Sequence, residues 1–245
     1  MRITGNTILI TGGGSGIGGG LAQAFHKLGN HVIVAGRRRE VLEKSGLDYL
    51  VLDTKDREAI QLAAAECETR FPDLNVVINN AGVQRHQDFS GHVDEKEIAD
   101  QIETNIMGVV GMTVAFLPQL KSKPSAAIVN VSSGLAFIPL ARVPVYCATK
   151  AFVHSFTVSL RHQLQNTNVR VIEIIPPWVK TDLGGPSTFV PEPGRGPMPL
   201  NAFIEATMND LASDQEELPV AGAKYLYRSG VGERFAETFA EMNRR

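Results

Sequence analysis

Short runs of apolar, mostly β-branched residues alternate along this chain with longer segments of helical pattern. The runs expected to form strands are 7–10, 31–34, 49–52, 76–78, 127–131 and 169–175. Several are apolar at consecutive positions, which is typical of parallel strands covered by helices on both faces. Helices are expected at about 16–28, 57–71, 94–120 and 146–165. This alternation predicts an α/β fold, a Rossmann-like doubly wound parallel sheet of six or seven strands with helices on both faces.

The length of 245 residues suits one large α/β domain and is short for two. We therefore expect residues 1–245 to form a single dinucleotide-binding and catalytic domain. Glycine and proline are dense in 184–200, after the last clear strand, so this segment fits either a substrate-side loop or a plain surface connection. Residues 201–245 are expected to be helical, with helix over 216–229 in place of a seventh strand.

Charge and composition argue against several classes of protein. The formal net charge is −2, which disfavours a nucleic-acid or membrane-surface role. No apolar run approaches the roughly 20 residues that cross a bilayer, and the N-terminus lacks the pattern of a signal peptide. Cys67 and Cys147 fall in separate expected helices, so we expect no disulfide and a reducing compartment. A cytoplasmic location is the resulting expectation.

A glycine-rich turn follows the first expected strand and opens the first expected helix. Such a turn lets backbone N–H groups approach a pyrophosphate, and the helix N-terminus adds partial positive charge. Gly14 to Gly19 fits G-x-G-x-x-G, but we favour the pattern G-x-x-x-G-x-G from Gly12 to Gly18, because Gly12 comes first after the strand. The place of the turn between strand and helix favours a dinucleotide site over a plain tight turn. The residues expected to contact the cofactor here are Gly12, Gly14, Ser15, Gly16, Ile17 and Gly18.

The end of the second strand indicates which dinucleotide binds. An NAD site usually has an acidic residue there, but this strand runs into Arg37, Arg38 and Arg39 before the acidic Glu40. A guanidinium can hold a 2′-phosphate that a carboxylate would repel. We therefore predict NADP(H) as the cofactor with Arg37 on the phosphate, and expect Arg38 and Arg39 to be solvated.

Further segments resemble the short-chain dehydrogenase/reductase family over roughly residues 5 to 182. They are Asn79-Asn80-Ala81-Gly82 after the fourth strand, Asn105 in the next helix, and Ser133 before Tyr146-Cys147-Ala148-Thr149-Lys150, the family's Y-x-x-x-K motif. Each is common alone, but their order and placement are specific. A short stretch between Arg39 and Tyr49 and the helical tail also resemble the branch associated with D-alanine esterification of teichoic acids.

The chemistry of the Y-x-x-x-K motif follows from its residues. Tyr146 and Lys150 are four positions apart on one helix, so their side chains share a face. A phenol with a pKa of about 10 needs a nearby cation to act as a base at neutral pH, and Lys150 supplies one. Ser133 is expected to hydrogen-bond the substrate oxygen, while Ser132 bonds locally.

The resemblance implies roles for residues outside this motif. It implies that Asn105 helps to hold a water that relays protons to the lysine, and that Lys150 also contacts the nicotinamide ribose. The further positions that the family uses for the cofactor are Asp53 on the adenine, Asn80 near its ribose, and Val179 and Thr181 beside the nicotinamide. Pro177 departs from the family pattern, which has glycine there, and Trp178 is either a wall of the substrate pocket or a structural residue.

The predicted function is therefore an NADP(H)-dependent oxidoreductase that interconverts a carbonyl and an alcohol on a small molecule. One alternative is a regulatory or scaffold protein that binds the dinucleotide with little turnover, and another is an epimerase or dehydratase acting on a nucleotide sugar. The six histidines lack metal-site spacing and no G-x-S-x-G segment supports a hydrolase, so neither a metal nor hydrolysis is expected. The resemblance also implies a homodimer or homotetramer formed through helices 94–120 and 146–165.

Overall fold

A parallel sheet of seven strands forms the centre of the protein, with the order β3-β2-β1-β4-β5-β6-β7. The computed structural model describes residues 1–183 and 196–232. The strands are β1 (Thr7–Thr11), β2 (His31–Gly36), β3 (Asp48–Val51), β4 (Leu74–Asn79), β5 (Ala126–Val131), β6 (Val169–Ile175) and β7 (Glu217–Pro219). The helices are α1 (Gly16–Lys27), α2 (Arg39–Glu43), α3 (Arg57–Arg70), α4 (Glu95–Ile102), α5 (Gly108–Lys121), α6 (Pro144–Leu164), α7 (Leu200–Leu211) and α8 (Ala223–Gly230). The predicted doubly wound α/β fold is confirmed, and its strand order reverses between β1 and β4.

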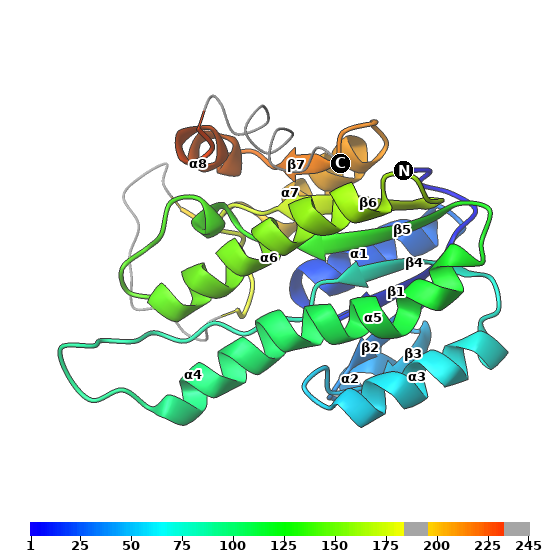
Figure 1. Ribbon diagram of the computed structural model, residues 1–245, viewed down its shortest axis with the longest axis horizontal. Coiled ribbons are helices and arrows are strands. Elements are labelled where there is room, and N and C mark those ends of the chain that lie inside the picture. Colours follow the sequence, from blue (N-terminus) through cyan, green and yellow to red (C-terminus); the bar gives the residue numbers. More distant parts are fainter. Residues whose placement is uncertain (184–195, 233–245) are drawn as a thin grey trace.

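Helices cover both faces of the sheet, which explains the consecutive apolar positions in its strands (Figure 1). On one face, α1 and α7 pack against side chains that include Ile10 and Ile174. On the other face, α3, α5 and α6 pack against side chains that include Leu9 and Ile128. With both faces buried, the ends of the strands are where a ligand can reach the sheet.

A row of polar side chains crosses the face that α5 and α6 cover. Asn79, Asn130, Glu173 and Glu217 are partners in register on β4, β5, β6 and β7. Asn79 Nδ2 donates to Asn130 Oδ1 at 2.8 Å, and Asn130 Nδ2 donates to the Thr157 hydroxyl on α6 at 2.9 Å. We call these four strand residues the polar row. It gives this face a polar band near the carboxyl ends of strands that are otherwise apolar.

The segment expected to be one helix over 94–120 is continuous but contains a wide turn. Between α4 and α5, Glu103–Met107 forms a π-helical turn. Such turns insert an extra residue into an α-helix and often occur at functional sites. Asn105 lies within it and is fully buried.

The C-terminal part differs from the expectation of helix over 216–229. Glu217–Pro219 forms a strand that pairs with β6, and α8 begins only at Ala223. The physical reason is the alternation around Leu218, whose side chain is buried in the α1 and α7 face while its neighbours are half-buried. Residues 184–195, most of the loop expected at 184–200, lie outside the described residues. The last part of the expected helical tail, 233–245, lies outside them as well. No helix in the described ranges 1–183 and 196–232 is long and apolar enough to cross a membrane.

Candidate active site

The glycine turn after β1 is braced by the segment that follows β4. Asn80 Nδ2 donates to the carbonyl oxygens of Thr11, at 2.9 Å, and Gly12, at 3.4 Å. The Thr11 hydroxyl accepts hydrogen bonds from the N–H groups of Asn80, at 3.0 Å, and Ala81, at 3.1 Å. Gly12 has a φ of +65°, and a Cβ there would lie 2.9 Å from Asn80 Nδ2, while a Cβ at Gly18 would overlap the same amide. Glycine is therefore required at both positions by close packing against Asn80.

The first turn of α1 keeps its backbone donors available. Ser15 is the extended N-cap residue, its side chain makes no capping hydrogen bond, and the turn contains no acidic residue. The first helical hydrogen bond runs from Gly19 N to Ser15 O at 2.9 Å. The N–H groups of Gly16, Ile17 and Gly18 therefore lie at the open end of the helix, where a phosphate is stabilised. These residues fit a dinucleotide pyrophosphate.

Two other glycines let neighbouring segments approach the turn. A Cβ at Gly14 would lie 3.0 Å from Val41 Cγ1 on α2. Gly16 has a φ of +55° and faces Thr181, whose Cγ2 would be 3.6 Å from an added Cβ. The structure thus brings Thr181, the residue predicted to lie beside the nicotinamide, next to the glycine turn.

The three arginines after β2 differ in their surroundings. Arg37 is exposed at the end of β2. Arg38 Nη2 lies 3.4 Å from the Ser15 hydroxyl, so this side chain reaches the glycine turn and is not simply solvated as expected. Arg39 instead donates to the Tyr49 hydroxyl at 3.0 Å.

Asp53 follows β3 at the same edge of the sheet. Its Oδ1 accepts a hydrogen bond from the Lys55 N–H at 3.1 Å, which shapes a turn there. Gly36 and Val51 pair in register at the ends of β2 and β3, so Arg37 and Asp53 follow neighbouring strands. Both residues therefore lie at the carboxyl edge of the sheet, where the glycine turn follows β1.

Ser133, Tyr146 and Lys150 meet where β5 ends and α6 begins. All three are at least nine-tenths buried. The Lys150 ammonium donates to the Val131 carbonyl oxygen at 2.8 Å and lies 5.7 Å from the centroid of the Tyr146 ring. The Ser133 hydroxyl accepts a hydrogen bond from Leu135 N at 3.1 Å and lies close enough to the Tyr146 phenol to lower its pKa. Three of the four side chains that the sequence predicted as catalytic are thus brought together, and Asn105 is the fourth.

Burial perturbs both titratable groups of this cluster. Burial raises the pKa of Tyr146 to about 12, although the Ser133 hydroxyl acts in the opposite direction. Burial also lowers the pKa of Lys150 to about 8, against the field of Glu173. At neutral pH the cluster therefore holds a neutral phenol beside an ammonium.

Asn105 connects the wide turn to the segment after β4 and to α6. Its Nδ2 donates to Val83 O at 2.9 Å and to the Thr149 hydroxyl at 3.0 Å, and its Oδ1 accepts from Val83 N at 2.8 Å. A Cβ at Gly82 would lie 3.3 Å from Asn105 Oδ1 and 3.6 Å from Lys150 Nζ. Gly82 therefore leaves a narrow space between the amide and the ammonium.

The segment after β6 runs along the same edge. Val179 is buried and forms a parallel bridge with Met198. Trp178 is 44% exposed, so it is not a core residue. Ser132, in contrast to Ser133, donates to the Ile174 carbonyl oxygen on β6 at 3.5 Å, a contact with the neighbouring strand in place of the local bond expected.

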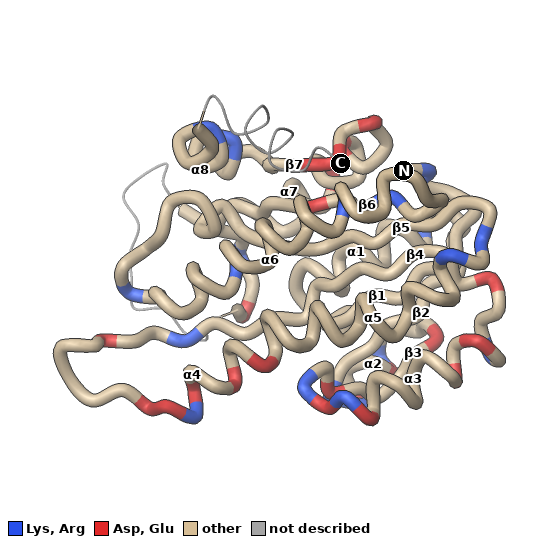
Figure 2. Tube along the Cα trace, viewed as in Figure 1, with Lys and Arg blue, Asp and Glu red and all other residues tan. Residues whose placement is uncertain are grey.

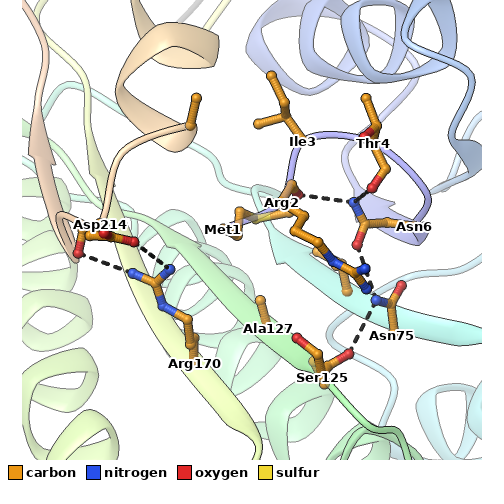
Figure 3. A pocket seen from close by; sticks show the side chains of 13 residues that line it. Met1, Arg2, Ile3, Thr4, Asn6, Asn75, Ser125, Ala127, Arg170 and Asp214 are labelled. Atoms are coloured by element: carbon orange, nitrogen blue, oxygen red, sulfur yellow. Dashed lines mark hydrogen bonds and ion pairs between the residues drawn. The ribbon is translucent and has the colours of Figure 1, made fainter.

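Two other hollows lie away from this cluster. A cavity of about 490 Å³ lies at the amino ends of the strands, the opposite edge of the sheet from Tyr146 (Figure 3). Its polar side chains bond to one another, as in the contact between Asn75 and Asn6 at 3.1 Å. A second hollow of about 750 Å³ lies between the C-terminal end of α6 and α8. Within the described residues no group of three or more His, Cys, Asp or Glu could hold a metal, and both cysteines are free.

Sequence reasoning missed four residues around the site. They are Thr11, Thr149, His154 and Glu173. The spacing of the histidines indicates only that a metal site is not expected, whereas His154 Nδ1 lies 2.8 Å from Glu173 Oε2 on another element. The available signal was Glu173 itself, the one acidic residue in the apolar run 169–175.

Comparisons with known proteins agree with this arrangement. Residues 6–188 match the family model described as short chain dehydrogenase. The chain is 47% identical over 192 residues, 75% of each chain, to the protein named "Uncharacterized oxidoreductase DltE" of Bacillus subtilis, which fits the branch resemblance noted in the sequence. It is also 36% identical over 182 residues, 72% of this chain and 73% of the other, to a serine 3-dehydrogenase of Rhizobium radiobacter.

Solved structures agree with this match. A short chain dehydrogenase from Burkholderia cenocepacia in complex with NADP superposes with a TM-score of 0.83 at 28% identity, covering 100% of both chains. A 3-ketoacyl-(acyl-carrier-protein) reductase from Brucella melitensis complexed with NADH gives a TM-score of 0.81 at 27% identity, covering 90% of this chain and 98% of the other. Their cofactors, together with the glycine turn, identify the ligand class as a nicotinamide dinucleotide. The chain belongs to the short-chain dehydrogenase family and is an oxidoreductase.

Proposed function

We propose that this enzyme interconverts a carbonyl and an alcohol on a small molecule, with NADP(H) as cofactor and Tyr146 as acid and base. The observation that carries the proposal is the buried cluster of Ser133, Tyr146 and Lys150 beside the glycine turn. A protein that only binds a dinucleotide has no need of all three side chains. This argues against the regulatory or scaffold alternative.

In the direction of reduction, Tyr146 donates its proton to the carbonyl oxygen. A phenol with a pKa near 12 is fully protonated at neutral pH, so the acid is in the required form. When bound, the reduced nicotinamide supplies the hydride for the carbonyl carbon. The Lys150 ammonium stabilises the phenolate that remains, and the Ser133 hydroxyl orients the substrate oxygen. Oxidation of the alcohol reverses both transfers.

Substitution of Tyr146 by Phe tests the acid/base role. We expect a loss of kcat/KM of at least about 100-fold, because proton transfer by a positioned side chain contributes this much or more. The measurement is NADPH oxidation against ketones, aldehydes and 3-oxoacyl thioesters. Ser132→Ala is the matched control, since the Ser132 hydroxyl contacts the backbone of β6. Unchanged turnover in Tyr146→Phe would refute the mechanism, and NADPH binding without turnover by the wild type would favour the binding-only alternative.

The preference for NADP(H) is proposed from the arginines after β2. Arg37 is the predicted partner of the 2′-phosphate, and Arg38 is a second candidate because its guanidinium reaches Ser15. Arg37→Asp should lower the ratio of kcat/KM for NADPH over NADH by at least roughly tenfold, because a carboxylate repels the phosphate. Arg39→Asp is the control, since Arg39 is bonded to Tyr49. If only Arg38→Asp changes the ratio, Arg38 and not Arg37 binds the 2′-phosphate.

We also propose a homodimer or homotetramer built on α5 and α6. Val114 on α5 is 62% exposed and Phe152 on α6 is 39% exposed, so both helices offer apolar surface to a second chain. Figure 2 shows α5 almost free of charged residues along its length, whereas α4 carries several. Light scattering that gives the mass of one chain would contradict this assembly.

A further inference from the structure

Helix α6 carries a third titratable side chain in line with the two catalytic ones. Tyr146, Lys150 and His154 are spaced by four residues, so they lie along one face of the helix. His154 Nδ1 lies 2.8 Å from Glu173 Oε2 on β6. The mechanism proposed above uses neither His154 nor Glu173.

Glu173 is buried to an extent that is rare for a carboxylate. Its side chain has no exposed surface, and its Oε1 has no hydrogen-bond partner among the described residues. A buried carboxylate with one unpartnered oxygen costs stability unless a nearby charge compensates it. His154 is the partner of the other oxygen, and its side chain is 15% exposed, so it can exchange protons with solvent.

Glu173 lies close to the anchor of Lys150. The ammonium bonds to Val131 O, and Val131 pairs in register with Ile174, the residue that follows Glu173. The field of Glu173 favours the charged form of Lys150, while burial disfavours it. Among the described residues, Glu173 is the charged group that supports the ammonium in this way.

We propose that Glu173 is a positioning residue that keeps Lys150 charged, and that His154 adjusts this effect by screening the carboxylate. A protonated His154 cancels part of the negative charge, so Lys150 experiences less of it. A neutral His154 leaves the carboxylate unscreened. The catalytic consequence rests on the proposed function, because a charged Lys150 matters only if it supports Tyr146.

Other charges around Glu173 come from three elements and set the background of this pair. From α6, Arg161 binds Glu217 on β7 at 2.9 Å, so these two largely compensate each other. From α8, Tyr227 also hydrogen-bonds to Glu217. The pKa of His154 is raised despite its burial, because Glu173 accepts its hydrogen bond and Glu217 adds to the field, while Arg161 opposes it. The imidazolium is therefore available to screen Glu173 near neutral pH.

The proposal is tested by titrating Lys150 directly in the full chain without cofactor. Lysine side-chain NMR gives the proton affinity of Lys150, and its signal is assigned by its disappearance in Lys150→Arg. Glu173→Gln removes the charge at constant shape, and we expect the proton affinity of Lys150 to fall roughly tenfold. His154→Asn keeps a donor for Glu173 but cannot become charged, so we expect the proton affinity read from the midpoint of the Lys150 titration to rise by up to about threefold. Glu216→Gln, at an exposed carboxylate that also contacts Arg161, is the control and should change nothing.

Opposite shifts in the two variants are the result that a merely structural role would not produce. Equal or absent shifts would overturn the proposal. If Glu173→Gln does not fold, His154→Asn decides alone, since an unchanged or lower affinity contradicts the screening role. The alkaline limb of kcat/KM against pH should move in the same direction as the NMR titration. A chain without turnover would refute the proposed function and leave the lysine titration measurable.

Discussion

The two faces of the sheet are covered by helices in the same way but differ in what lies beneath them. Under α1 and α7 the strands present apolar side chains to the carboxyl end, with Ile78, Val131 and Ile174 in one continuous core. Under α5 and α6 the apolar side chains give way to the polar row, which includes the buried carboxylate of Glu173. The first face has the composition of a core built for stability. The second holds the catalytic helix and carries buried polar groups that reduce stability in exchange for fixed charges near the site.

The largest expected effect on stability comes from removing a large side chain from the apolar face. Phe203 on α7 is fully buried in this core, so Phe203→Ala should lower the free energy of unfolding by about 4 kcal/mol through lost burial and a cavity. Urea denaturation measures the change. Leu62→Ala at a 65% exposed site on α3 is the control and should cost less than about 0.5 kcal/mol. A loss under about 1 kcal/mol for Phe203→Ala would show that this face is not the main source of stability.

A smaller effect, a gain in stability, is expected from a substitution on the face with the polar row. The fall of the Lys150 pKa to about 8 corresponds to roughly 3 kcal/mol against the buried ammonium. Lys150→Met removes this cost and loses one hydrogen bond worth about 1 kcal/mol, so it should stabilise the chain by about 2 kcal/mol at pH 7 while abolishing turnover.

The pH dependence of this gain provides its control. Since the folded pKa of Lys150 is depressed, the unfolded chain binds more protons between pH 8 and 10.5, and the wild type gains stability as pH rises through that window. The advantage of Lys150→Met should therefore shrink above pH 8. An advantage that is independent of pH would have to come from packing alone.

The smallest effect is expected from His154. Its pKa is raised above the model-peptide value of 6.5, chiefly through its bond to Glu173, although burial acts against this. The stability from this ion pair is present below pH 6.5 and is lost as pH rises through the raised folded pKa. Thermal unfolding between pH 6 and 8 should show a decline that is weaker in His154→Asn. Identical slopes in the two proteins would mean that the pair contributes nothing to the pH dependence.

The fold and the catalytic cluster were predictable because local patterns determine them. Consecutive apolar positions predicted six strands of a buried parallel sheet, and the spacing of Tyr146 and Lys150 placed them on one helix face. The glycine turn was identified by its place between a strand and a helix. Backbone donors at a helix N-terminus bind a phosphate without the help of a particular side chain, and glycine keeps them accessible.

The parts that could not be predicted depend on contacts between distant segments. Nothing in the sequence near Arg38 indicates that its guanidinium reaches Ser15 rather than solvent. The pair of His154 and Glu173 forms only when α6 packs across β6. Likewise, β7 exists only because its three residues pair with the carboxyl half of β6. Such pairings are set by tertiary packing, which local propensity does not record.

The π-helical turn at Glu103–Met107 makes the site depend on the length of a segment as well as on its composition. A regular α-helix advances about 100° per residue, so one additional residue rotates everything before it relative to everything after it by about that angle. Deleting one residue of this turn other than Asn105 would restore an ordinary helix and leave Ser133, Tyr146, Lys150 and Asn105 in the sequence. It would nevertheless turn Asn105 away from Val83 and Thr149, its three hydrogen bonds would be lost, and the segment after β4 would be released. In a chain of this kind, two sequences with the same motifs but different residue counts in this helix therefore need not share the same active site.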